Sequence, residues 1–333
     1  MSAVLTSEPM AISSETATEQ ALAEIEQHRR ELTGYCYRML GSFSEAEDAV
    51  QETMVRAWRN IESFEGRSSL RSWLYRIATN VCLDMLRGRK RRAVAMDMGP
   101  ASPADIPSLP DTLPANHWVE PITDERVMPE GDPAAVVEAR ESIRLAFVAA
   151  LQHLPAKQRA VLILREVLRW QATEVAELLD TTVASVNSAL QRARATLGER
   201  EIRATATTLD DAQKELVARY VDAFERYDIP TLVALLHDDA IMSMPPFPLW
   251  LKGPEDMGAW FLGHGLGCQG ARLVPTHANG CPAFGSYRVD PAGGWMPFSI
   301  QVIEISGDRI VGHHNFLEAE TLFPRFGLPD HLD

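Results

Sequence analysis

The chain has 333 residues, 46% of them hydrophobic, which is enough for two or three domains with cores of their own. A net charge of −14 excludes a protein that coats nucleic acid through its overall charge, so any DNA contact has to come from local basic patches. The four cysteines lack metal-site spacing and no apolar run could span a membrane, so we expect a cytoplasmic protein with reduced thiols, no metal and no cofactor.

Residues 1–18 are small, polar and acidic, and we expect them to be disordered. They lack the basic start and the apolar centre of a signal peptide. A helical stripe then begins at Glu19 and ends at Gly41.

A second helix is predicted to start at Ser44, which can cap it, and its first turn carries acids that suit the helix dipole. Asp48, Gln51 and Glu52 fall on its polar side. From the residues alone, a solvated acidic face is the simplest interpretation.

The segment 64–92 mixes cations with aromatic residues. A turn at Glu65-Gly66 precedes a helix whose apolar positions recur every three or four residues. Because phosphates attract positive charge and unpaired bases stack on aromatic rings, this segment suits single-stranded nucleic acid. An ordinary core helix with a solvated basic tail is the alternative.

Residues 93–133 carry eight prolines and eight acids but a single arginine, Arg126, and have no periodicity. This composition predicts an extended linker between two domains. Within it, HWVEPITDE is unusually specific for a spacer.

From 134 to 200 the pattern is helical, with one helix ending at Pro155 and KQRAVLILREVLRW forming the next. QATEVAELLDTTVASVNSALQRARATL then predicts a helix-turn-helix, although a plain helical hairpin has a similar pattern. The polar side of its second helix can enter a major groove, where Asn, Gln and Arg read base edges. The candidate DNA contacts on this helix are Ser185, Asn187, Ser188, Gln191, Arg192 and Arg194.

Residues 208–326 predict an α+β domain, with helices over 216–227, TLVALLHDD and PEDMGAWFLGHGL. The strand AIMSM precedes the last of these, and a hairpin across Gly307-Asp308 ends the domain. We expect a curved antiparallel sheet.

The pattern F-x-G-R-S-S-x-R-x-W-L-Y-R-I-A-x-N-x-x-L-D over 64–84 resembles the promoter-melting segment of bacterial extracytoplasmic-function (ECF) RNA polymerase sigma factors. SEAEDAVQETMVRAW resembles the sigma segment that docks on the largest-subunit clamp of the polymerase. The helix-turn-helix, with LPAKQRAVLILRE before it, resembles the domain that reads the −35 element and touches the flap of the second-largest subunit. The resemblance implies a non-enzymatic subunit whose partners are core RNA polymerase and promoter DNA.

Site residues follow from this resemblance by position. The implied polymerase contacts are Asp48, Gln51, Glu52 and Met54. The implied contacts with the melted −10 element are Phe64, Arg67, Ser68, Trp73, Arg76, Asn80 and Arg87. In sigma factors the linker threads toward the active-site channel, so the resemblance implies that Glu120, Asp124 and Glu125 mimic nucleic-acid charge; plain solvation of these acids is the alternative. Leu74 stands where housekeeping sigma factors carry a second tryptophan, which implies weaker melting.

The C-terminal stretches DDAIMSMPPFPLWLKG and GPEDMGAWFLGHG resemble SnoaL-like domains, α+β cones related to nuclear transport factor 2. Such cones enclose a pocket that could take a small-molecule ligand, and in sigma factors the resemblance implies a regulatory role. Only one of His313 and His314 can point inward, because neighbours on a strand face opposite ways. The pocket candidates are Met242, Met244, Phe247, Trp250, Trp260, Phe261, His264, His277, Tyr287 and His313, or His314 in its place.

The predicted fold class is multidomain, with two all-α helical domains and a C-terminal α+β cone. Its divisions are a disordered 1–18, sigma region 2 over 19–92, the linker 93–133, region 4 over 134–200 and the SnoaL-like domain over 208–326. Two alternatives stay open: an enzyme whose C-terminal pocket turns over a small molecule, and a stand-alone helix-turn-helix regulator that binds duplex DNA without polymerase.

Overall fold

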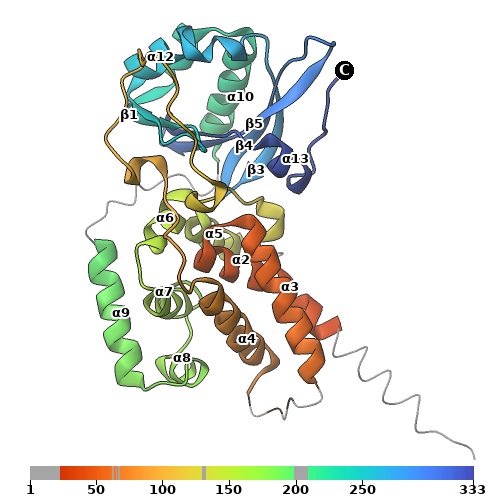
Figure 1. Ribbon diagram of the computed structural model, residues 1–333, viewed down its shortest axis with the longest axis vertical. Helices are drawn as coiled ribbons and strands as arrows, with labels where there is room; N and C mark the ends of the chain where they lie inside the picture. The colour runs from red at the N-terminus through yellow and green to blue at the C-terminus, as the bar shows by residue number, and fades with distance from the viewer. Residues whose placement is uncertain (1–22, 62–63, 65, 67, 130–132, 199–208) are drawn as a thin grey trace, which may run out of the picture.

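A computed structural model describes residues 23–61, 64, 66, 68–129, 133–198 and 209–333. It shows a helical half stacked end to end with a half built from helices on a sheet (Figure 1). The predicted disordered residues 1–18 and the boundary between 200 and 208 lie outside the described residues.

The first helices pack around one apolar centre. They are α2 (Arg29–Leu40), α3 (Phe43–Asn60) and α4 (Leu70–Met85), and their buried residues include Tyr35 and Leu74. The cap of α3 is Ser42 and not Ser44, because Ser42 has the extended backbone of a cap residue and its hydroxyl accepts a hydrogen bond from the Glu45 amide.

The linker does not lie free in solvent. It contains the short 3-10 turns η2 (Ala95–Asp97), η3 (Ala115–His117) and η4 (Asp124–Arg126), and a parallel bridge joins Ala93 to Trp118. Trp118, Val119 and Ile122 are buried. The apolar residues of HWVEPI thus anchor a segment whose prolines and acids are typical of an unattached spacer.

The following helices are α5 (Pro133–Ile143), α6 (Leu145–Gln152), α7 (Ala156–Leu162) with a π-turn η5 (Ile163–Val167), α8 (Ala172–Leu178) and α9 (Val183–Gly198). The predicted helix before Pro155 is broken in two, since Arg144 leaves the helical region at φ −56° and ψ 143°. The turn between α8 and α9 contains Asp180 at φ +50°, and the helix-turn-helix is present as predicted.

The C-terminal half begins with α10 (Asp211–Arg226), α11 (Ile229–Ala234), β1 (Leu236–Ser243), β2 (Trp250–Lys252), α12 (Pro254–Leu262) and η6 (His264–Cys268). It continues with β3 (Arg272–Ala278), β4 (Cys281–Val289), β5 (Trp295–Ser306), β6 (Arg309–Phe316) and α13 (Ala319–Arg325). Gly307, at φ +59°, turns the predicted hairpin between β5 and β6.

Within the described residues the strands form a six-stranded sheet in the order β2-β1-β6-β5-β4-β3. The sheet is mixed and not wholly antiparallel as expected, because β1 lies parallel to β6. The residues HDD of TLVALLHDD belong to β1 and not to a helix, so the short helix α11 ends at Ala234.

The sheet has an apolar layer on each face. Its concave face and α10–α12 enclose a cluster that includes Tyr220, Phe224 and Phe261. Residues of the other face, among them Tyr287 and Ile300, belong to the same apolar cluster as α2, α3 and α4. The helical half and the sheet therefore share a continuous core. No helix in the described ranges combines the length and the apolar character needed to cross a membrane.

Candidate functional site

The polar side of α3 carries the residues implied to bind polymerase. Asp48, Gln51 and Glu52 are exposed, whereas Met54 is 8% exposed and packs into the core. Glu52 is paired with Arg56 at 2.6 Å across one helical turn, an exposed pair that adds little stability. The face thus offers carboxylate and amide groups beside a buried apolar row, which suits a polar protein interface.

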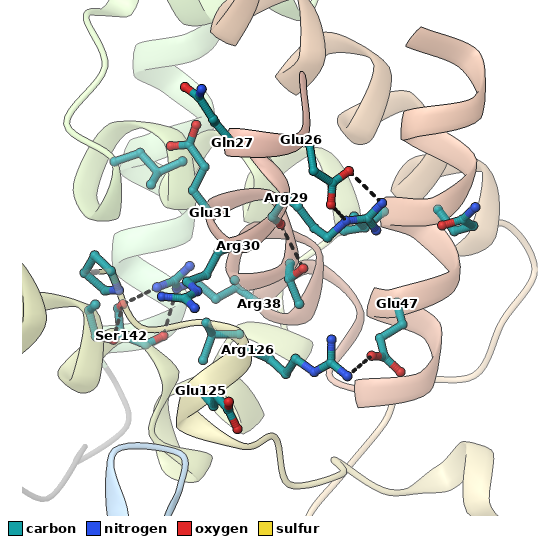
Figure 2. A pocket seen from close by; sticks show the side chains of 18 of the residues that line it. Glu26, Gln27, Arg29, Arg30, Glu31, Arg38, Glu47, Glu125, Arg126 and Ser142 are labelled. Carbon is teal, nitrogen blue, oxygen red and sulfur yellow. Dashed lines mark hydrogen bonds and ion pairs between the residues drawn. The ribbon is translucent and has the colours of Figure 1, made fainter. Parts of the chain in front are cut away.

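Asp48 and Gln51 also line a cavity of about 1260 Å³ between the helical half and the C-terminal half (Figure 2). Its walls come from α2, α3, the linker at Glu125 and Arg126, the α5 end, residues 167–169 and residues 324–327. Figure 2 shows Arg126 reaching Glu47 of α3, with their atoms 3.9 Å apart. A partner that fills this cavity would contact α3, the linker and the end of α13 together.

A buried arginine ties one wall of this cavity to the next. Arg38 of α2 donates hydrogen bonds to the Ser142 carbonyl at 3.1 Å and to its hydroxyl at 2.6 Å (Figure 2). Burial lowers the pKa of the Arg38 guanidinium to about 10, so it stays charged at neutral pH. The bonds attach α2 to α5 across 104 residues of sequence.

In the predicted DNA-melting segment, two aromatic side chains lie against each other. The rings of Phe64 and Trp73 lie 5.2 Å apart, and Trp73 is half-buried against the core. On α4 and just after it, Arg76, Asn80 and Arg87 are exposed, while Ser68 is half-buried before the helix. Arg67 lies outside the described residues. A ring pair beside exposed cations can stack a base and neutralise phosphates.

The second helix of the helix-turn-helix presents its polar side to solvent. Ser185, Asn187, Ser188, Gln191, Arg192 and Arg194 are all exposed. Val186, Leu190 and Ala193 are buried against the other helices, and the Thr182 hydroxyl caps α9 by accepting from the Ser185 amide. Arg192 is bonded to Ser188 and Arg194 to Glu166, each at 2.6 Å, so a DNA contact would exchange these bonds for phosphate or base contacts.

Sequence reasoning missed a heavily bonded polar side chain of the domain junction, Asn279. It stands in the β3–β4 turn at φ +54°, is fully buried, and reaches three segments of the helical half. Its Oδ1 accepts from the Ile122 amide at 3.0 Å, and its Nδ2 donates to the Tyr37 hydroxyl at 2.7 Å and the Ile143 carbonyl at 2.6 Å. The Asn279-Gly280 dipeptide is a hairpin signal, but its sequence gives no sign that the turn is buried.

Comparisons with known proteins assign three segments of the chain. Residues 25–92 match the family model of Sigma-70 region 2, residues 144–197 that of Sigma-70, region 4, and residues 217–313 that of a SnoaL-like domain. The ECF RNA polymerase sigma factor SigG of Mycobacterium tuberculosis (strain ATCC 25618 / H37Rv) is 45% identical over 317 residues, which cover 93% of this chain and 84% of that relative. The chain belongs to the ECF RNA polymerase sigma factors.

A second ECF RNA polymerase sigma factor of the same organism, SigJ, is 28% identical over 284 residues, covering 80% of this chain and 84% of SigJ. The crystal structure of SigJ has the same fold, with a TM-score of 0.59 and 23% identity, and covers 92% of this chain and 100% of that chain. The predicted family and fold class are confirmed, and promoter recognition is the function of this sigma factor.

Regions 2 and 4 of this sigma factor pack directly on each other. The rings of Tyr75 in α4 and Trp170 before α8 lie 5.1 Å apart, and the Arg71 guanidinium lies over both rings. Arg159 of α7 is buried and donates to the Met39 carbonyl of α2, and burial lowers the pKa of its guanidinium to about 10. These contacts hold α2 and α4 of region 2 against the helices of region 4.

The linker acids have structural partners. The Glu120 carboxylate accepts from the Ser42 hydroxyl at 2.8 Å and the Phe43 amide at 3.0 Å at the start of α3, and Arg92 lies 3.7 Å away. Asp124 accepts from the Gly280 amide at 2.7 Å, and burial raises the pKa of its carboxyl. Glu125, by contrast, is exposed. In this arrangement Glu120 and Asp124 face protein and are neither solvated nor available to mimic nucleic acid.

The pocket candidates of the SnoaL-like domain divide between several places. Trp260 is buried in the cone and Met244 is partly buried there, whereas Trp250 and His264 lie at its mouth. Tyr287 does not line the cone, because it shares the opposite face of β4 with Cys281 and Ala283 and packs on Phe323 of α13.

His277 does not lie in the cone either. It is exposed at the end of β3, where it lines a separate cavity of about 530 Å³ with Arg30, Asp124 and Arg140. Sequence alternation places a strand residue on one face but does not say whether that part of the strand is covered.

His313 is the inward member of the histidine pair. It is buried, and its Nε2 lies 2.9 Å from the Tyr220 hydroxyl, which donates to Gln301 at 2.7 Å. Burial, with a smaller effect of His314, lowers the pKa of His313 to about 3. The imidazole ring of His313 packs against the rings of Phe224 and Phe261 at centroid distances of 6.4 and 6.0 Å, so aromatic side chains fill this part of the cone. His314 faces the other way and is bonded to Ser243 at 2.8 Å.

Proposed function

We propose that this sigma factor docks on the largest-subunit clamp of core RNA polymerase through Asp48, Gln51 and Glu52, with the buried Met54 supporting this face of α3 from within the core. The exposed carboxylate and amide groups of α3 support this contact, since they can form the polar rim of an interface. Helix α7, with the turn that follows it, would touch the flap of the second-largest subunit.

We also propose that α4 and the residues before it bind the −10 element. Phe64 and Trp73 would take unstacked bases, because their paired rings stand beside exposed cations. The remaining contacts proposed for the melted region are Arg67, Ser68, Arg76, Asn80 and Arg87.

Helix α9 would read the −35 element from the major groove. Its exposed polar side combines amide, hydroxyl and guanidinium groups that match base edges and phosphates. The residues proposed to make these contacts are Ser185, Asn187, Ser188, Gln191, Arg192 and Arg194.

In our proposed domain organisation, 19–92 forms region 2, 93–133 the linker, 134–200 region 4 and 208–326 the regulatory domain. The observation that supports regulation best is the buried Asn279 turn, which bonds to region 2, the linker and the helices of region 4 together. The SnoaL-like domain would hold the sigma domains in a closed arrangement and so limit transcription. Because the Tyr220 hydroxyl bonds to both Gln301 and His313 in an interior filled by aromatic side chains, we propose that the domain acts through contacts and not through turnover of a substrate.

Reconstituted transcription with core polymerase tests this proposal, on the promoter upstream of the protein's own gene. The full chain should bind core polymerase and open this promoter. A chain truncated after residue 205, or a full chain with a loosened Asn279 junction, should give more transcript at equal concentration. Equal amounts of transcript from all three proteins would contradict the regulatory role of the SnoaL-like domain. Failure of the full chain to associate with core polymerase would contradict the whole proposal.

A further inference from the structure

The first half of the linker lies along the mouth of the SnoaL-like cone. We call residues 99–114 the strap, and Figure 1 shows it passing beside α12 and β1. The Trp250 indole donates to the Gly99 carbonyl at 3.0 Å, and the Ser102 amide donates back to the Trp250 carbonyl at 2.8 Å. Further along, His264 Nε2 donates to the Ile106 carbonyl at 2.7 Å. The strap is therefore bonded through its backbone as a bound peptide would be.

A last hydrogen bond and two apolar side chains complete the attachment. The Leu113 amide donates to the Pro246 carbonyl at 2.9 Å. Ala104 and Ile106 pack against the apolar cluster of the cone, whereas Leu109 is 44% exposed. One side of the strap is thus seated on the domain and the other faces solvent.

The chemistry of both partners fits this mode of binding. The strap has prolines at 100, 103, 107, 110 and 114, and such segments are extended and lose little conformational entropy on binding. The mouth supplies aromatic surface, where the rings of Trp260 and His264 lie 4.8 Å apart, and indole and imidazole donors for the peptide carbonyls. Proline-rich peptides are commonly bound by aromatic-lined grooves with such donors.

We propose that the cone mouth, formed by Pro246, Trp250 and His264 with the buried Trp260 packed on His264, is a binding site for an extended proline-rich peptide, and that its occupant is the chain's own linker. While the strap is bound, this part of the linker cannot enter the polymerase channel. The regulatory step of the inference rests on the proposed function. The control lies at the linker itself, and the cone mouth takes a peptide.

The test uses a matched pair of full-length variants. Ile106→Asp places a charge in the apolar seat, whereas Leu109→Asp makes the same kind of change on the exposed side of the strap. Hydrogen exchange is followed at the Ser102 and Leu113 amides, which lie outside helices and strands but donate to the cone mouth. We expect both amides to be protected in the unmodified chain and in Leu109→Asp, and to exchange at least about tenfold faster in Ile106→Asp, which corresponds to about 1.4 kcal/mol.

The same proteins are then compared in reconstituted transcription. Ile106→Asp should give more transcript than Leu109→Asp. Unprotected amides in the unmodified chain, equal exchange in the two variants, or lost protection with unchanged transcription would each overturn the inference. The exchange experiment needs no polymerase, so it still decides where the strap lies if the chain proves unable to support transcription.

Discussion

The junction built on Asn279 gives the sharpest prediction. Asn279→Ala removes the acceptor of the Ile122 amide and the donor to the Ile143 carbonyl, both in a fully buried place. A buried polar group left without a partner costs about 1–3 kcal/mol, so the two together cost about 2–6 kcal/mol. The Tyr37 hydroxyl adds little, because it keeps its bond to the Glu120 carbonyl at 2.7 Å.

Asn279→Gly separates hydrogen bonding from backbone strain. Alanine at φ +54° adds the cost of a left-handed backbone, whereas glycine adopts it freely. Urea unfolding of the full chain measures the change in unfolding free energy, and susceptibility of the linker to protease reports loosening of the junction. Both variants should lose at least about 2 kcal/mol and expose the linker. A glycine variant as stable and as resistant as the unmodified chain would refute the reasoning.

Three further predictions concern other parts of the molecule. The pKa of His313 is lowered from about 6.5 to about 3, so between these pH values the unfolded state binds one proton more than the folded state. The free energy of unfolding is therefore highest above pH 6.5 and falls by about 1.4 kcal/mol per pH unit between pH 6.5 and pH 3. His313→Gln should reduce the difference between the urea midpoints at pH 7.5 and pH 5.5, and an unchanged difference would contradict this. Trp73→Ala should make the free energy of promoter opening less favourable by about 1–3 kcal/mol, while affinity for core polymerase stays the same. Permanganate reactivity of unpaired thymines measures the opening. A loss of polymerase affinity with normal opening would contradict a role of Trp73 in DNA melting. Asp48→Lys should weaken binding to core polymerase at least about tenfold in a titration. The control variant Glu255→Lys makes the same charge change at an exposed residue of α12 and should leave the affinity unchanged. Equal effects of the two variants would count against the α3 interface.

Local patterns predicted much of the fold. The helical spacing and the Asp-Thr-Thr turn predicted α8 and α9, and the alternation of strand residues predicted that His313 and His314 face opposite ways. Apolar residues recur every three to four positions in a helix and every two positions in a strand because of the geometry of these elements. Such spacings therefore predict helices and strands reliably.

Contacts between distant segments were not predictable in this way. The partners of Asn279 include Ile122 and Tyr37, which lie 157 and 242 residues away, and no local pattern relates them. The linker resembled a free spacer because its prolines and acids outnumber its few anchoring residues. Tyr287 was expected in the cone because aromatic residues are typical of such pockets, but its position on β4 puts it on the opposite face.

We propose that the SnoaL-like domain keeps α4 and α9, the helices proposed to contact the promoter, in a closed arrangement that core polymerase must open. Energy transfer between dyes at the exposed positions Asp84 on α4 and Ala195 on α9, which lie outside the proposed DNA contacts, tests it directly. We expect efficient transfer in the free protein, and a marked fall when core polymerase and promoter DNA are added. Unchanged transfer in a complex that is producing transcript would contradict it.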